Sequence, residues 1–177
     1  LICDHGVFPE ANHIVAAVQL LQNITPHRNK PFMSSLVLDH NATSAILALA
    51  NRADVLGLVK GYLQSGPSIK SMQAYRSVQS VRKPRSSQLW HCDGDYTPQV
   101  KMFVLCSDVA MENGPLTFIP ATESAVVWAR TTYNTDKRLE SSDITEQPIM
   151  LIGPVGNVCF IDTSRCFHYG SRIRRGE

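Results

Sequence analysis

Apolar residues recur at the spacing of an α-helix through the first third of the chain. Two stretches, residues 12–24 and 43–63, carry them on one helical face. These faces consist of Ile14, Val18 and Leu21 in the first stretch, and of Ile46, Leu49, Ala50, Ala53, Leu56, Val59 and Leu63 in the second. The pattern predicts a mostly helical lead-in over residues 1–66.

The second helical stretch has weak points. Gly57 and Gly61 lower its helix propensity, so the sequence predicts either one helix or two short ones. Asn41 and Thr43 both have side chains suited to cap its N-terminus.

After Pro67 the pattern changes to short apolar runs, each bounded by the turn-forming residues Gly, Pro, Asn or Asp. The runs are SQLWH (87–91), QVKMFVLCSDV (99–109), PLTFIP (115–120), PIMLIG (148–153) and NVCFIDTS (157–164). Residues 69–78 alternate without a clear buried face, and residues 121–146 are polar, which predicts a long loop with some helix.

Several short strands after a helical lead-in favour a mainly β, mixed α+β fold. We expect a jelly-roll barrel over residues 67–177, with the helices packed on one outer sheet. A parallel α/β fold suits the pattern less well, because no helix-length segment separates the later strands.

Composition supports one globular domain over residues 1–177. The chain is 44% hydrophobic with a net charge of +2, so no strong field favours nucleic acid or an anionic membrane. The basic run Arg82-Lys83-Pro84-Arg85 is interpreted as a solvated turn rather than a grip on an anionic substrate. The first and last residues do not resemble natural ends, so we expect a chain trimmed at both ends.

Cysteine usage bears on the compartment. The five cysteines are odd in number and contain no CxxC pair, which argues against a disulfide framework or a zinc knuckle. This pattern favours a reducing, cytoplasmic location. No apolar run is long enough to span a bilayer.

The segment WHCDGDY, residues 90–96, carries the candidate chemistry. His91 and Asp93 stand two positions apart, so on a strand both side chains point to the same face. Two histidines and one carboxylate with open positions are typical of non-haem Fe(II) oxygenases. The alternative is a hydrogen-bonded pair at a turn, and Asp95 could be a second carboxylate near the metal or a turn residue.

A third ligand comes from the end of the chain. His168 follows the strand-like NVCFID, and a late strand of a jelly roll runs beside an early one. Four other histidines lie in the helical lead-in and are interpreted as surface or capping residues: His5, His13, His27 and His40. The predicted metal set is therefore His91, Asp93 and His168.

Three segments together resemble the phytanoyl-CoA dioxygenase family of Fe(II)- and 2-oxoglutarate-dependent oxygenases. They are QLWHCD (88–93), MENGPLTFIPATES (111–124) and GNVCFIDTSRCFHYGSRIRRGE (156–177), and the resemblance extends over about residues 45–177. One departure is Ala121-Thr122-Glu123, which stands where the family usually has Gly-Ser-His; it touches no metal ligand.

The resemblance implies a double-stranded β-helix, with His91, Asp93 and His168 as iron ligands and catalytic centre. It also implies 2-oxoglutarate and O2 as co-substrates. The expected reaction hydroxylates a small organic molecule and converts 2-oxoglutarate to succinate and CO2. Because chlorinating members of the family lack the carboxylate ligand, the presence of Asp93 favours hydroxylation over halogenation.

The family usually binds the far carboxylate of 2-oxoglutarate with an arginine about ten residues after the second histidine. That position falls just past Glu177. Arg172 and Arg174 share a strand face with His168, whereas Arg175 points the other way. Arg174 is our candidate, and the alternative is that all three are solvated charges.

Three further residues are candidates for the co-substrate pocket. Gln73 and Tyr75 precede the motif on a strand and could donate hydrogen bonds to co-substrate or substrate. Thr117 lies within NGPLTF and could face the pocket, whereas Trp90 should point away from it, into the core.

Two other functions remain open from the sequence. One is a cupin-like enzyme that uses the metal without 2-oxoglutarate, and the other is a non-catalytic jelly-roll binding module. In the preferred interpretation the partner is a small-molecule substrate, and residues 121–146 form a lid that selects it.

Overall fold

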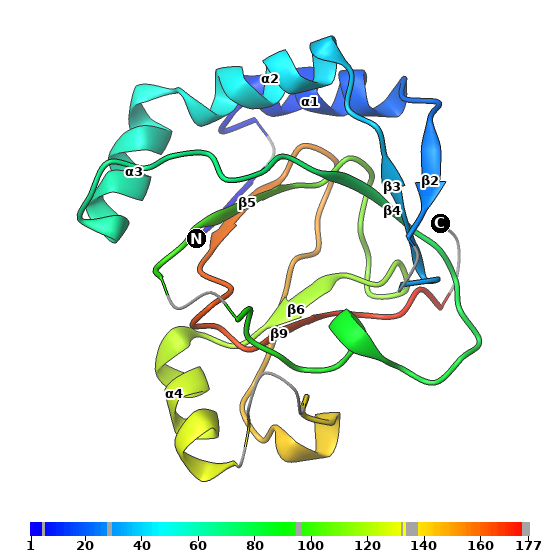
Figure 1. The fold of residues 1–177 in the computed structure, drawn as a ribbon, viewed down its shortest axis with the longest axis vertical. Coiled ribbons are helices and arrows are strands. Elements are labelled where there is room, and N and C mark those ends of the chain that lie inside the picture. The colour runs from blue at the N-terminus through cyan, green and yellow to red at the C-terminus, as the bar shows by residue number, and fades with distance from the viewer. Residues whose placement is uncertain (5, 28–29, 95–96, 132, 134–137, 175–177) are drawn as a thin grey trace. The chain divides into compact units, whose positions relative to one another are not determined.

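The chain has a mixed α+β fold with small antiparallel sheets (Figure 1). The structure, a computed structural model, describes residues 1–4, 6–27, 30–94, 97–131, 133 and 138–174. The described residues divide into two compact units. Unit 1 comprises Leu1–Val78, Met102–Asp108 and Gly153–Cys159, and unit 2 comprises Gln79–Lys101, Val109–Ile152 and Phe160–Glu177.

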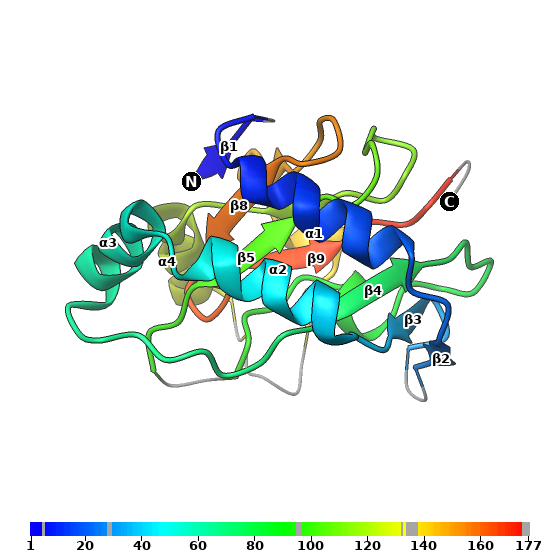
Figure 2. The same cartoon turned by 90° about the horizontal axis from the view of Figure 1, so that it is seen from above.

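Three helices belong to unit 1: α1 (Pro9–Gln19), α2 (His40–Ala50) and α3 (Ala53–Leu63). α1 and α2 lie side by side (Figure 2). α1 begins with proline, whose fixed φ suits the first helical turn. Its buried face is Ala11, Ile14, Val15 and Val18, which confirms the apolar stripe seen in the sequence.

The second helical stretch forms two helices, and its predicted cap was wrong. Asp39 is the N-cap of α2, because its Oδ1 accepts a hydrogen bond of 2.8 Å from the amide of Ala42. Neither Asn41 nor Thr43 has this role, since the helix already begins at His40. The two helices separate after Asn51, so Gly57 and Gly61 do not cause the break but lie inside α3.

Arg52 explains the position of that break. Its guanidinium binds Asp54 at 2.8 Å and Glu10 of α1 at 2.8 Å, while its backbone is extended. Within the described ranges no single helix is long and apolar enough to cross a membrane. α2 and α3 meet that test of length and composition only as a pair, across a bend of 66°.

Two of the three sheets contain strands of unit 1. β2 (Ile24–Pro26), β3 (Met33–Leu36) and β4 (Ala74–Ser77) form an antiparallel sheet in that order. The second sheet has the order β1-β8-β5, with β1 (Ile2–Cys3) antiparallel to β8 (Val158–Ile161). β5 (Lys101–Val104) and β8 each have residues in both units.

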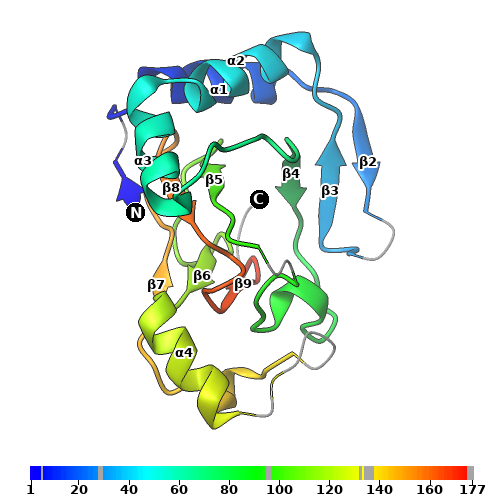
Figure 3. The same ribbon diagram turned by 60° about the vertical axis from the view of Figure 1, so that its left-hand side comes forward.

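The third sheet lies within unit 2 and has the order β7-β6-β9. Its strands are β7 (Ile149–Met150), β6 (Leu116–Phe118) and β9 (His168–Gly170), and all its pairings are antiparallel. A bridge from His91 to His168 places the segment of Trp90 and His91 beside β9, and a bridge from Trp90 to Leu139 places Leu139 beside that segment. Figure 3 shows β6 and β9 side by side, with α4 (Ala121–Arg130) continuing from β6.

Apolar side chains gather on one face of this sheet and under α4. The buried cluster consists of Trp90, Cys92, Ile119, Val127, Tyr133, Leu139 and Phe167. Trp90 is in this core, as the sequence indicated. The polar segment 121–146 contains α4 and a short 3-10 helix, Ser141–Asp143, which agrees with the expectation of some helix there.

The turn before β6 requires glycine. Gly114 has a φ of +75°, and a Cβ atom there would lie 2.6 Å from the carbonyl oxygen of Ser171. The turn therefore lets the start of β6 approach the segment after β9 closely. The hydrogen-bonded turn lies just before Gly114, where the amide of Asn113 donates to the carbonyl of Ala110 at 3.1 Å, so the interpretation of Asn113-Gly114-Pro115 itself as a tight turn stays a prediction.

Candidate metal centre

The two predicted histidine ligands form a cross-strand pair. The amide of His91 donates to the carbonyl of His168 at 3.1 Å, and the amide of His168 donates back at 2.9 Å. Directly paired residues of an antiparallel ladder point to the same face. Their imidazole rings accordingly lie 4.2 Å apart between centroids, and both side chains are buried.

Asp93 joins this face from the same segment as His91. Its amide donates to the carbonyl of Thr163 at 2.8 Å, which fixes the backbone. Asp93 Oδ1 lies 3.9 Å from Nε2 of His91, and Oδ2 lies 3.9 Å from Nε2 of His168. Two segments that are distant in the sequence thus bring one ligand atom of each of the three residues to within 4.8 Å of one another.

Both imidazoles are oriented by their second nitrogen. Nδ1 of His91 lies 2.8 Å from the carbonyl oxygen of Leu89, and Nδ1 of His168 lies 3.0 Å from that of Cys166. A carbonyl only accepts hydrogen bonds, so each Nδ1 carries the proton and each Nε2 keeps its lone pair. This outer contact is the usual way in which a metal-binding histidine is held.

The residues present suit a divalent metal ion. Two ligand atoms that are each about 2.1 Å from one ion are at most about 4.2 Å apart, so both nitrogen–oxygen pairs can contact the same ion. A separation of 3.9 Å is also too long for a hydrogen bond, which leaves the lone pairs available. Two imidazoles and one carboxylate are the set that suits Fe(II).

Electrostatics keeps the histidines in the form that binds metal. Burial, followed by the nearby His168, lowers the pKa of His91 to about 3. Burial also lowers the pKa of His168. Both rings are therefore neutral at neutral pH, as a metal ligand must be.

Lys101 at the start of β5 is a charged partner of the carboxylate. Its ammonium group donates to Oδ2 of Asp93. Burial is the largest single effect and by itself would raise the pKa of Asp93, but the hydrogen bond from Lys101 and the other favourable contacts together outweigh burial and hold the pKa at about 2. The carboxylate is thus ionised, and Oδ1 remains free of this ion pair.

Tyr133 holds the residue between two of the ligands. Its hydroxyl accepts a hydrogen bond of 3.0 Å from the amide of Cys92 and donates one of 3.1 Å to the carbonyl of Cys92. The ring itself packs edge-on against Phe167, at 4.8 Å between centroids. One buried phenol therefore fixes the backbone from His91 to Asp93.

Thr117 is not brought to the metal set. It pairs with Tyr169, whereas Phe118 pairs with His168, so side-chain alternation places Thr117 on the opposite face of the sheet. There it is fully buried, and its hydroxyl lies 2.8 Å from that of Ser171. Thr117 therefore does not adjoin the metal set, and its place in a co-substrate pocket stays a prediction.

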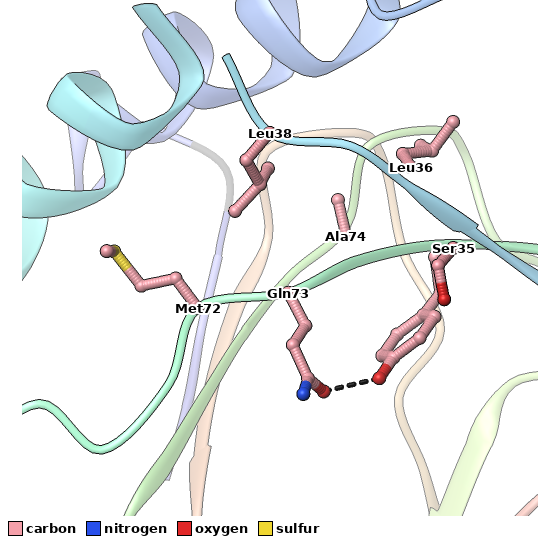
Figure 4. A pocket seen from close by; sticks show the side chains of 7 residues that line it. Ser35, Leu36, Leu38, Met72, Gln73 and Ala74 are labelled. Atoms are coloured by element: carbon pink, nitrogen blue, oxygen red, sulfur yellow. Dashed lines mark hydrogen bonds between the residues drawn. The ribbon is translucent and has the colours of Figure 1, made fainter. Parts of the chain in front are cut away.

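Gln73 and Tyr75 lie in unit 1, where they line a pocket of about 210 Å³ (Figure 4). The Tyr75 hydroxyl donates to the side-chain oxygen of Gln73. Leu36, Leu38 and Met72 provide apolar walls. The two residues thus form a polar pair in a pocket of their own unit, and their role toward a co-substrate stays a prediction.

The arginines after His168 differ in their surroundings. The Arg172 guanidinium donates to the backbone carbonyls of Ser80 and Arg82, so it is already committed to the exposed basic turn. Arg174 is exposed, and its backbone amide donates to the carbonyl of Glu112 at 2.7 Å. Arg175 and Asp95 lie outside the described residues.

The sequence did not reveal three residues that act on this centre: Lys101, Tyr133 and Arg138. A lysine within the apolar run QVKMFVLC was a usable signal for Lys101. The other two come from the polar segment after α4, where no hydrophobic period indicates which side chains turn inward.

All five cysteines lie in the described part of the chain, and none of them forms a disulfide. Comparisons with protein-family models, with curated proteins and with solved structures give no match to this chain.

Proposed function

We propose that the protein is a non-haem Fe(II)- and 2-oxoglutarate-dependent oxygenase that hydroxylates a small organic molecule. The observation that carries the proposal is the convergence of His91, Asp93 and His168 on one face of a sheet, with both Nε2 lone pairs free. The resemblance of three segments to the phytanoyl-CoA dioxygenase family adds the co-substrate and the reaction class. The same resemblance supports a jelly-roll arrangement of the strands.

In this proposal the three side chains hold the ion from one side and leave its other positions for co-substrate and O2. A bound Fe(II) supplies O2 activation coupled to oxidative decarboxylation of 2-oxoglutarate, and thereby the hydroxylation of a C–H bond. The two neutral imidazoles bind through Nε2, and Asp93 supplies the single negative charge. Lys101, which donates to Asp93, would keep this carboxylate ionised.

The surroundings of the histidines also suit reactive chemistry. Phe118 is the direct cross-strand partner of His168, so its ring lies on the same face of the sheet. An apolar ring beside the histidines would help to exclude water, which strengthens charge interactions and protects reactive species from side reactions. Retention of the carboxylate ligand favours hydroxylation over halogen transfer.

The test is an anaerobic titration of the purified protein with Fe(II) and 2-oxoglutarate, following the visible charge-transfer band of the chelated co-substrate. We expect the band only when both are present, and we expect Asp93→Ala to abolish or shift it. Asp4→Ala is the matched control, because Asp4 is exposed and lies in unit 1.

Other results would identify the alternatives. Iron binding without a band would favour a cupin-like enzyme that does not use 2-oxoglutarate. Absence of iron binding would leave a non-catalytic module, and the proposal would be wrong.

A further inference from the structure

Helix α3 presents an apolar face that is largely uncovered. Of its eleven residues, all of them described, Val55 alone is buried, whereas α1, a helix of equal length, buries four. Leu58 is 39% exposed and Tyr62 is 43% exposed. At 3.6 residues per turn these two side chains lie one turn apart, on the side of the helix that also carries Val55. The face that α3 would be expected to bury in a core is therefore open to a partner.

The direction of α3 explains this exposure. The chain bends by 66° between α2 and α3, so α3 leaves the pair that α1 and α2 form (Figure 1). Arg52 binds Asp54 and Glu10 at the N-terminal end of α3. Leu58 and Tyr62 belong to the C-terminal half of the helix, beyond these ion pairs.

The charges that accompany this face are positive. Residues 55–78, all in unit 1, contain Lys60, Lys70 and Arg76 but no Asp or Glu, so this segment carries three positive charges in a chain whose net charge is only +2. By helical spacing, Lys60 flanks the apolar face of α3. Lys70 follows the helix next to Ile69, which is 51% exposed. The net charge of the whole chain hides this local concentration.

We propose that α3 and the segment after it bind the surface of a membrane that contains anionic phospholipids. Leu58, Tyr62 and Ile69 enter the boundary between headgroups and acyl chains, while Lys60 and Lys70 meet the anionic headgroups. Tyrosine suits this depth, because its ring is apolar and its hydroxyl stays among polar groups. Lysine lays its apolar stem along such a face and keeps its ammonium group in the headgroup layer.

A second copy of the chain suits this face less well. A two-fold interface joins the same patch of both copies, so Lys60 and Lys70 would face their own symmetry mates. Residues 55–78 supply no carboxylate that could balance them. An anionic bilayer supplies the opposite charge over the whole face, and it accepts separate apolar side chains without a matching pocket.

The experiment measures co-sedimentation of the full chain with vesicles of phosphatidylcholine alone, or of an equal mixture of phosphatidylcholine and phosphatidylserine. The test variants are the double variant Leu58→Gln/Tyr62→Gln and the single variant Lys60→Gln. Leu20→Gln is the apolar control, because Leu20 is 77% exposed at the end of α1. Lys83→Gln is the charge control, because Lys83 is exposed in the basic turn of unit 2. Urea denaturation of each variant reports whether the fold is intact.

We expect the wild type to bind the mixed vesicles at about 0.1 M NaCl and to lose most of this binding at about 1 M, because salt screens the headgroup charges. Vesicles of phosphatidylcholine alone should bind it far more weakly. The double variant should bind the mixed vesicles at least about 10-fold more weakly. Lys60→Gln should lose about fivefold, as suits one basic residue near an anionic surface. Both controls should bind as the wild type does, and all urea midpoints should agree.

Three results would contradict the inference. Failure of the wild type to bind mixed vesicles would exclude a lipid surface as the partner of α3. Binding that Lys83→Gln loses and the double variant keeps would assign the membrane contact to the basic turn. If the wild type sediments as a dimer without vesicles and the double variant as a monomer, a second copy covers the face instead. None of these results bears on the proposed function, because the metal set lies in unit 2.

Discussion

Individual residues of the metal centre are held by groups that are not ligands. Each histidine is tied through Nδ1 to a carbonyl two positions earlier, and Tyr133 holds Cys92 between the other two ligands. Such contacts fix the directions of the ligand atoms before any ion binds. The metal affinity of the candidate centre therefore depends on groups that are not themselves ligands.

Tyr133→Phe tests this dependence. The change leaves the amide and the carbonyl of Cys92 without their buried partner, while the ring that packs on Phe167 is kept. We expect divalent metal affinity to fall about 10- to 100-fold. The measurement is a Mn(II) titration, with Tyr75→Phe as control because Tyr75 lies in unit 1 and is exposed. Equal affinities for the two variants would show that Tyr133 does not position the ligands.

Whether a residue of the site could be predicted from the sequence depends on whether local spacing or long-range pairing sets its position. His91 and Asp93 could be identified because their spacing places both on one strand face, and His168 because it follows a late strand. Arg138 and Tyr133 lie near one another in a polar segment, and their positions depend on the pairing of Leu139 with Trp90. That pairing is a long-range contact without a local pattern.

Among the elements, α4 is linked to the strand that carries His168. Ser124 in its first turns is buried, and its hydroxyl accepts a hydrogen bond of 2.9 Å from the amide of Phe167 and donates one of 3.2 Å to the carbonyl of Ile119. A single hydroxyl thus joins the helix to both β6 and β9 at the point where they pair. The helix helps to set the position of His168, the next residue after Phe167.

Ser124→Ala should destabilise unit 2. Because the amide of Phe167 would remain buried without an acceptor, we expect a loss of about 1–3 kcal/mol in the free energy of unfolding. Urea denaturation followed by tryptophan fluorescence measures this loss, since both tryptophans, Trp90 and Trp128, belong to unit 2. Thr122→Ala, at an exposed position of the same helix, should have little effect. A Ser124→Ala variant as stable as the Thr122→Ala variant would contradict the link.

Element positions were easier to predict than element ends. Apolar spacing indicated the helices because burial of one face drives their packing. Their ends depend on single polar contacts, such as the cap by Asp39 and the ion pair of Arg52 with Glu10, a residue distant in the sequence. Four of the five predicted strand runs contain a strand, for the same reason as the helices. The prediction for SQLWH was wrong, because that run begins in a 3-10 helix, Ser86–Gln88, and pairs only through isolated bridges at Trp90 and His91. Closure of the sheets into a jelly roll depends on long-range pairing and stays a prediction.

At the scale of the whole molecule, the buried histidines make stability depend on pH. In the unfolded chain a histidine has a pKa of about 6.5, whereas burial lowers that of His91 to about 3 in the folded protein. At pH values between these two pKa values, His91 is protonated in the unfolded state and neutral in the folded state. As far as His91 is concerned, the free energy of unfolding therefore has its full value above about pH 6.5 and decreases as the pH falls below that value.

For His91 the expected loss between pH 7 and pH 5 is about 2 kcal/mol of unfolding free energy. His168, whose pKa is also lowered by burial, acts in the same direction. Urea denaturation with a chelator present, followed by tryptophan fluorescence at pH 7, 6 and 5, measures the loss. His91→Gln should reduce the loss by about the amount due to one histidine, whereas His13→Gln, an exposed position, should not. The explanation fails if His91→Gln leaves the pH dependence unchanged.

The protonation state of the Cys92 thiol determines how readily this sulfur is oxidised. Burial raises its pKa to about 12, so at neutral pH it is an uncharged sulfur held between two metal ligands. Peroxides attack thiolates far faster than neutral thiols. If the centre activates O2 as proposed, a sulfur atom beside it would ordinarily be the first group of the protein to be oxidised by the reaction. In that proposed function, a sulfur kept protonated and buried by the fold would resist this oxidation over repeated turnovers.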